Sequence, residues 1–121
     1  ELEIKNIEKG STHTIQDILF ETNSSKIDQS SELVLEAFAS WLNLNSDIEI
    51  EIQGHTDDVG GEGDNLALSK DRAFSVMEFL INQNVLASRM RFKGYGELNP
   101  KFNNDSNINR TKNRRTDFLI L

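Results

Sequence analysis

The chain has 121 residues, a length that fits one domain built on a single hydrophobic core. Its 20 acidic residues outnumber its 13 Lys and Arg residues, and the net charge of -7 argues against a general nucleic-acid binder, because phosphate backbones are also negative. Cysteine is absent from the sequence, which excludes a disulfide framework and a thiolate zinc site.

The first strand is predicted early in the chain. Residues 1–12 contain three spaced aliphatic side chains before a turn-prone glycine, which leaves open a linker or a short edge strand. From His13 to Phe20, β-branched and aromatic residues predict a strand, and the turn-prone residues 22–25 end it.

A helix is predicted next. Asp28, Ser30 and Ser31 offer side-chain oxygens that can cap its start, and apolar residues then recur at helical spacing up to about Leu44. The expected apolar stripe comprises Leu33, Val34, Ala37, Phe38 and Trp41.

A strand and a second helix follow. From Asp47 to Gln53, isoleucines alternate with polar residues, as a half-buried strand requires. The three glycines of residues 59–64 predict a loop, and a helix is expected from near Asn65 to Asn82. Its expected apolar face comprises Leu66, Ala67, Ala73, Phe74, Val76, Met77 and Leu80.

Two further strands complete the prediction. Residues 90–95 alternate in polarity, Pro100 marks a loop, and residues 115–121 form the last strand. Intervening helices require parallel crossovers, whereas the last two strands need only a loop. The predicted βαβαββ order therefore gives an α/β fold, a two-layer sandwich with two main helices on one face of a mixed parallel and antiparallel sheet.

Five blocks of sequence carry a family resemblance. They are Phe20-Glu21-Thr22-Asn23-Ser24, Gly54-His55-Thr56-Asp57, Asn65 to Ala73, Gly94-Tyr95-Gly96-Glu97 with Pro100, and Arg110 with Asn113, Arg114 and Arg115. In order and spacing they resemble the OmpA-like peptidoglycan-binding domain of outer-membrane OmpA-type proteins, peptidoglycan-associated lipoprotein and the flagellar stator protein MotB. The resemblance covers residues 13–121, which we expect to form the domain.

The resemblance implies a ligand and a set of binding residues. The ligand is the peptidoglycan stem peptide, chiefly its zwitterionic diaminopimelate residue, and no cofactor is implied. By resemblance Asp57 takes the ammonium and Arg72 the carboxylate, which an Arg fork can bind bidentately. The residues matching other pocket positions are Asn23, Thr56, Asn65 and Arg114. Thr116 and the acidic loop 60–64 depart from the family pattern.

The resemblance also implies a location and a parent protein. We expect a periplasmic domain that anchors its parent to the cell wall and is attached to the outer membrane through the rest of that parent. The start of the chain lacks the basic and then apolar pattern of a signal peptide, so we expect the export signal to belong to the longer parent.

Several other interpretations carry less weight. An enzyme using Asp57 or Asp58 with His55 lacks a nucleophile and a second placed carboxylate. With His13 the only other histidine, we expect His55 to be a buried imidazole bonded to backbone groups rather than a metal ligand, and the acidic loop lacks calcium-site spacing.

Two alternatives concern interactions rather than chemistry. The phosphate-loop reading of residues 60–63 fails because no Lys-Ser or Lys-Thr follows. Arg115 is expected to make a structural ion pair with Glu49 or Glu51. The alternative function is a structural or interaction domain that keeps the fold but no longer binds the cell wall. Ligand titration distinguishes this alternative from peptidoglycan binding.

Overall fold

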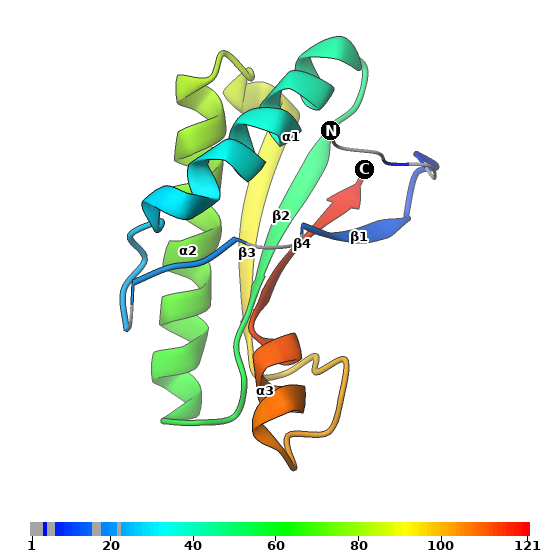
Figure 1. Ribbon diagram of the computed structural model, residues 1–121. Helices are drawn as coiled ribbons and strands as arrows, with labels where there is room; N and C mark the ends of the chain where they lie inside the picture. Colours follow the sequence, from blue (N-terminus) through cyan, green and yellow to red (C-terminus); the bar gives the residue numbers. More distant parts are fainter. Residues whose placement is uncertain (1–3, 5–6, 16–17, 22) are drawn as a thin grey trace.

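The computed structural model describes residues 4, 7–15, 18–21 and 23–121. Its elements are β1 (Thr12–Ile15), the 3-10 turn η1 (Gln29–Ser31), α1 (Glu32–Leu44), β2 (Ile50–His55), α2 (Glu62–Asn82), the 3-10 turn η2 (Ala87–Arg89), β3 (Met90–Gly96), α3 (Asn107–Asn113) and β4 (Arg115–Ile120). Figure 1 shows α1 and α2 against one face of the sheet and α3 at its lower end. The predicted two-layer α/β architecture is confirmed.

The sheet has the strand order β1-β4-β2-β3. The β2–β3 pair is parallel and is joined by the crossover helix α2, whereas β4 runs antiparallel to both β1 and β2. The connection before β4 was expected to be a loop, but it contains α3, whose first turn is capped by the Ser106 hydroxyl accepting from Asn109 N at 3.1 Å. Mixed pairing, as predicted, therefore comes from β4 inserting between β1 and β2.

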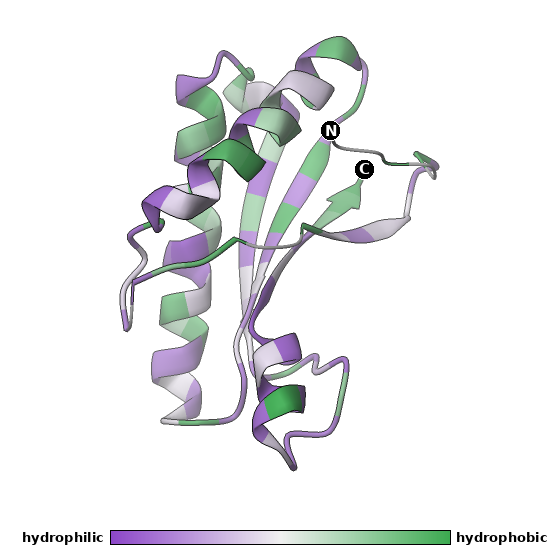
Figure 2. Cartoon of the chain, viewed as in Figure 1, coloured by the Kyte–Doolittle hydropathy of each residue, from purple (hydrophilic) through white to green (hydrophobic). Residues whose placement is uncertain are grey.

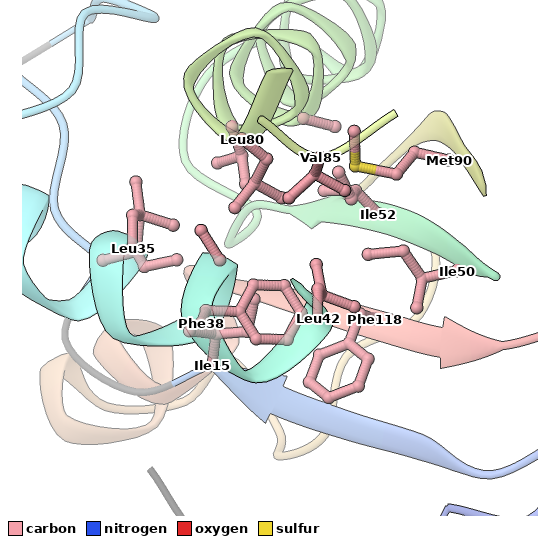
Figure 3. Close-up of a cluster of buried hydrophobic side chains, with 14 of the residues drawn as sticks. Ile15, Leu35, Phe38, Leu42, Ile50, Ile52, Leu80, Val85, Met90 and Phe118 are labelled. Atoms are coloured by element: carbon pink, nitrogen blue, oxygen red, sulfur yellow. The ribbon is translucent and has the colours of Figure 1, made fainter. Parts of the chain in front are cut away.

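The hydrophobic core lies between the helices and the sheet. Phe38 of α1 packs on Phe118 of β4 with ring centroids 4.7 Å apart, beside Ile50 and Ile52 (Figure 3). The buried face of α1 differs from the predicted apolar stripe: Leu33, which was expected on that stripe, is 76% exposed. The buried residues of this helix are Leu35, Phe38, Ala39 and Leu42.

The buried face of α2 also differs from the prediction. The helix begins at Glu62 inside the predicted loop, and Leu66 and Phe74 are both 44% exposed. Its buried residues are Asn65, Ser69, Ala73, Val76 and Leu80. Asn65 and Ser69 are polar, so a search for apolar residues at helical spacing cannot identify the N-terminal part of the buried face of α2.

Two glycines explain why the small residue Ser69 is buried on α2. A Cβ atom on Gly54 of β2 would lie 2.2 Å from Ser69 O, and one on Gly94 of β3 would lie 2.3 Å from Lys70 N. The Ser69 hydroxyl also accepts a hydrogen bond from Gly96 N at 2.9 Å. The backbone of α2 therefore rests directly on the ends of β2 and β3.

The predicted first strand is shorter than expected. β1 ends at Ile15, residues 16–17 lie outside the described part of the chain, and Phe20 makes only an isolated bridge with Ile27. The Ser31 hydroxyl accepts a hydrogen bond from Leu19 N at 2.6 Å instead of capping α1. A side chain, not a neighbouring strand, is therefore the hydrogen-bond partner of the Leu19 backbone N–H. The possible edge strand in residues 1–12 falls partly on residues outside the description, and residues 7–11 form no strand.

The sheet face away from α1 and α2 is polar. Hydrophilic and hydrophobic residues alternate along β2 and β3 in Figure 2. Glu51 receives hydrogen bonds from Arg91 Nε at 2.8 Å and Tyr95 OH at 2.9 Å. The expected pairing of Arg115 with Glu49 or Glu51 was wrong: its Nε lies 3.0 Å from Asp117 Oδ2, two residues along the same strand face.

Replacing Gly94 by Ala is expected to destabilise the fold by about 3 kcal/mol, because the new methyl group meets helix backbone that cannot rotate away. Chemical denaturation measures the free energy of unfolding. Gly63→Ala is the matched control, since its Cβ meets nothing within 4 Å and alanine favours helix by roughly 0.5–1 kcal/mol. Equal stability of the two variants would contradict the close contact.

Candidate functional site

A cavity of about 530 Å³ opens where the carboxyl end of β2, the first half of α2 and the end of α3 meet residues 18–20 and 23. The carboxyl end of β2, the first half of α2 and α3 lie at the lower part of the molecule in Figure 1. All six residues predicted from the sequence line it: Asn23, Thr56, Asp57, Asn65, Arg72 and Arg114. The fold thus brings together residues that are up to 91 positions apart (114 minus 23).

Asp57 is buried and held by hydrogen bonds on both carboxylate oxygens. Its Oδ1 accepts from Val59 N at 3.0 Å, and its Oδ2 forms an ion pair with Arg114 Nη1. The preceding Thr56 donates its hydroxyl to Asp57 O at 2.8 Å and its backbone N to Gly96 O at 2.8 Å. The carboxylate is therefore fixed in orientation before any ligand arrives.

Arg72 reaches the cavity from α2. Its Nε donates to Ser24 O at 2.8 Å, and its guanidinium lies over the Phe20 ring, 4.9 Å from the centroid. Burial and the nearby Arg114 lower the pKa of Arg72, and Asp57 opposes this shift. Among the described residues, no carboxylate lies within 4.0 Å of Arg72. Its two terminal nitrogens, Nη1 and Nη2, make no hydrogen bond to any described residue.

The two asparagines differ in what they do. The buried Asn65 amide donates to Val59 O at 3.1 Å, Asp57 O at 3.3 Å and Glu97 Oε1 at 3.2 Å, so it ties the loop after β2 to α2. Asn23 is exposed and has a φ of 53°, a left-handed conformation that asparagine tolerates better than most residues. Asn65 therefore shapes the cavity, whereas Asn23 stands at its rim.

His55 is buried, as expected, but its nitrogens do not bond backbone groups. Neither ring nitrogen has a hydrogen-bond partner among the described residues, and Nε2 lies 3.5 Å from Asp117 Oδ2. The ring stacks on Tyr95 with centroids 5.1 Å apart. Burial, followed by the charge of Arg115, lowers the pKa of His55 to about 4 against the opposing effect of Asp117, so the ring is neutral at pH 7.

Sequence reasoning missed the apolar and hydroxyl parts of the cavity wall. Phe20 supports Arg72 by stacking, and the hydroxyl of Thr111 accepts from Arg114 Nη2 at 2.9 Å. Phe20 stood in a recognised block without an assigned role, and Thr111 had no signal because α3 was not predicted. Both residues position a guanidinium.

The described ranges hold neither a cluster of metal-ligating side chains nor a helix able to span a membrane. No three His, Asp or Glu side chains there come together as a metal site. Over the same residues, every helix is too short or too polar to pass through a lipid bilayer.

Comparisons with known proteins place this geometry in context. A model described as the OmpA family matches residues 19–114. The peptidoglycan-associated lipoprotein of Mesorhizobium japonicum is 36% identical over 83 residues, covering 69% of this chain and 49% of that protein. The peptidoglycan-binding protein ArfA of Mycobacterium tuberculosis is 30% identical over 103 residues, covering 85% of this chain and 32% of that protein.

A solved structure agrees over nearly the whole chain. The periplasmic domain of Helicobacter pylori MotB (residues 97–256) matches with a TM-score of 0.82 and 31% identity, covering 96% of this chain and 85% of that one. The resemblance inferred from the sequence is confirmed. The chain spans about half the length, or less, of the curated relatives it matches.

The buried His55 predicts a pH-dependent stability. Its folded pKa of about 4 lies below the ordinary 6.5, so the unfolded chain binds the extra proton, and stability falls as pH drops from about 6.5 to 4. The expected loss is about 3 kcal/mol, measured by denaturation at a series of pH values.

His55→Phe is the matched variant, because it keeps an aromatic ring against Tyr95 and removes the titration. Burial raises the pKa of Glu51, but hydrogen bonds from Gln53, Tyr95 and Arg91 lower it more, so its contribution is lost only below pH 4.5. The window from pH 6.5 to 4.5 therefore tests His55, and an equal slope in the Phe variant contradicts the assignment.

Proposed function

This chain belongs to the OmpA family, and from this premise we propose that it binds bacterial peptidoglycan non-covalently, through the diaminopimelate residue of the stem peptide. The observation that carries the proposal is the charge pattern of the cavity. Three guanidinium groups, on Arg72, Arg114 and Arg115, line the cavity beside one carboxylate, on Asp57. Arg114 pairs with Asp57 and Arg115 with Asp117, which leaves Arg72 without a described carboxylate partner. An incoming carboxylate balances Arg72, and a zwitterion brings an ammonium for Asp57 as well.

Each ligand group has a partner in this proposal. The ammonium of diaminopimelate lies against Asp57, which can accept a further hydrogen bond because a carboxylate has about four lone-pair sites. The neighbouring carboxylate binds the terminal nitrogens of Arg72, whose orientation Phe20 and Ser24 already fix. Thr56, Asn65, Asn23 and Arg114 complete the contact surface.

The proposed role is anchoring rather than catalysis. His55 is neutral and buried against Tyr95, and the cavity presents no activated nucleophile among the described residues. We infer that the domain acts in the periplasm and holds a parent protein, attached to the outer membrane, to the cell wall. Modest affinity at one site suffices, because many copies facing one polymer gain strength by multivalency. The names of the lipoprotein and ArfA relatives support this role.

Conservative variants of the two charged residues test the site. Asp57→Asn keeps an oxygen for Val59 N but loses the negative charge, and Arg72→Lys keeps the positive charge but loses the fork. Each is expected to lower the affinity for diaminopimelate-containing stem peptide at least about tenfold, measured by calorimetric titration. Alanine is unsuitable at Asp57, which is only 6% exposed and not the surface position expected from the sequence.

Asp58→Asn is the matched control for Asp57→Asn. Asp58 is the next residue, is exposed, and pairs with Arg110 at 3.3 Å outside the cavity lining. Its affinity should equal that of the parent. Affinity retained by both Asp57→Asn and Arg72→Lys, with intact thermal melts, rules out this site.

Insoluble peptidoglycan incubated with the parent should release no soluble fragments.

Ligand variation tests the role of Arg72 separately. A stem peptide with lysine in place of diaminopimelate offers the ammonium without the adjacent carboxylate. Its binding should be weaker by about 1 to 3 kcal/mol, because Arg72 is left without its anionic partner. Titration of the two peptides under identical salt measures the difference. Equal affinities argue that the carboxylate does not reach Arg72.

A further inference from the structure

A second groove of about 700 Å³ lies beside the proposed diaminopimelate pocket. The two share walls, since Leu19, Thr111 and Arg114 line both. The far side of the groove is formed by Lys101 and Phe102 after Pro100 and by Lys112 on α3. The proposed pocket and the groove are therefore adjacent.

The groove is basic in an acidic chain. Lys101 Nζ donates to Thr14 Oγ1 at 2.7 Å, and Lys112 Nζ lies 4.9 Å from the centroid of the Phe102 ring. Neither lysine has a carboxylate within 4.0 Å among residues 4, 7–15, 18–21 and 23–121. Two ammonium groups without carboxylate partners thus flank one groove, although the chain as a whole carries a net charge of -7.

The wall carrying these groups is rigidly built. Asn113 is fully buried, and its Oδ1 accepts from Lys101 N at 2.9 Å and from Phe102 N at 3.0 Å. Its Nδ2 donates to Phe102 O at 2.8 Å and to Asn104 Oδ1 at 2.9 Å. One side chain thus fixes the backbone that presents Lys101 and Phe102, and binding need not order this loop.

We propose that this groove binds a carboxylate of the stem peptide next to the diaminopimelate residue, namely the free α-carboxylate of the preceding γ-linked glutamate. The inference rests on the proposed function and extends it to a second subsite. Lys101 and Lys112 supply the charge, and Leu19 and Phe102, which are 55% and 43% exposed, supply apolar surface for the rest of the peptide. Lysines that serve only to solvate a surface do not require a wall shared with a pocket, nor a buried Asn113 that accepts hydrogen bonds from the backbone of Lys101 and Phe102.

The test uses the double variant Lys101→Gln/Lys112→Gln and three soluble ligands. The ligands are free diaminopimelate, the tripeptide Ala-γ-Glu-diaminopimelate, and the same tripeptide with the glutamate α-carboxylate converted to an amide. The variant should bind the acid tripeptide roughly five- to tenfold more weakly than the parent does. Its affinity for free diaminopimelate should be unchanged, because that ligand is net neutral and fills only the first pocket.

Two comparisons make the result specific. The parent should prefer the acid tripeptide to the amide by a similar factor, and the variant should bind both alike. Lys9→Gln/Lys70→Gln, which removes two exposed lysines elsewhere and changes the net charge equally, should behave as the parent. Melting temperatures of both double variants check that the fold persists.

The outcomes separate the two levels of the proposal. If the parent binds free diaminopimelate and the acid tripeptide but the variant loses no affinity, or loses it equally for acid and amide, the groove assignment is wrong and the first pocket stands. If the parent binds none of the three ligands, the proposed function fails and the groove proposal fails with it.

Discussion

The direct contact of the α2 backbone with Gly54 and Gly94 positions everything else at the site. Since neither strand has a side chain there, the helix lies against the ends of β2 and β3, and Ser69 bonds Gly96 across the gap. Asn65 and Arg72 lie on either side of Ser69 along the same helix. Their distance from Asp57 at the end of β2 is therefore set by backbone packing, which deforms less than a contact between side chains.

The charged side chains of the cavity are held in fixed orientations, and one of them, Arg72, has no oppositely charged partner among the described residues. Asp57 is oriented by Val59 N and Arg114, and Arg72 by Phe20 and Ser24. Fixing these groups in the folded state removes part of the entropy cost of binding. The guanidinium of Arg72, which has no described carboxylate partner, then favours an anionic group, even though the whole chain is acidic. Local arrangement, not net charge, decides which ligand is attracted.

Sequence patterns failed where a polar residue replaced an expected apolar one. Ser69 is buried on α2 because a glycine pair faces it, so hydropathy shifted the predicted face toward Leu66 and Phe74, which are half exposed. The helix α3 was missed because it is short and its only large apolar side chain, Ile108, is 70% exposed. Without α3 the wall shared by the pocket and the groove could not be anticipated.

The sequence by itself determined the two-layer α/β class, because alternation and helical periodicity are local properties of the chain. Its resemblance to the OmpA family pointed to the six residues that line the cavity. Only the tertiary structure decided that Asp57 pairs with Arg114, that Arg72 stacks on Phe20 without a described carboxylate partner, and that Arg115 pairs with Asp117. These choices depend on distances between elements, which strand order and backbone packing fix and which no local pattern encodes.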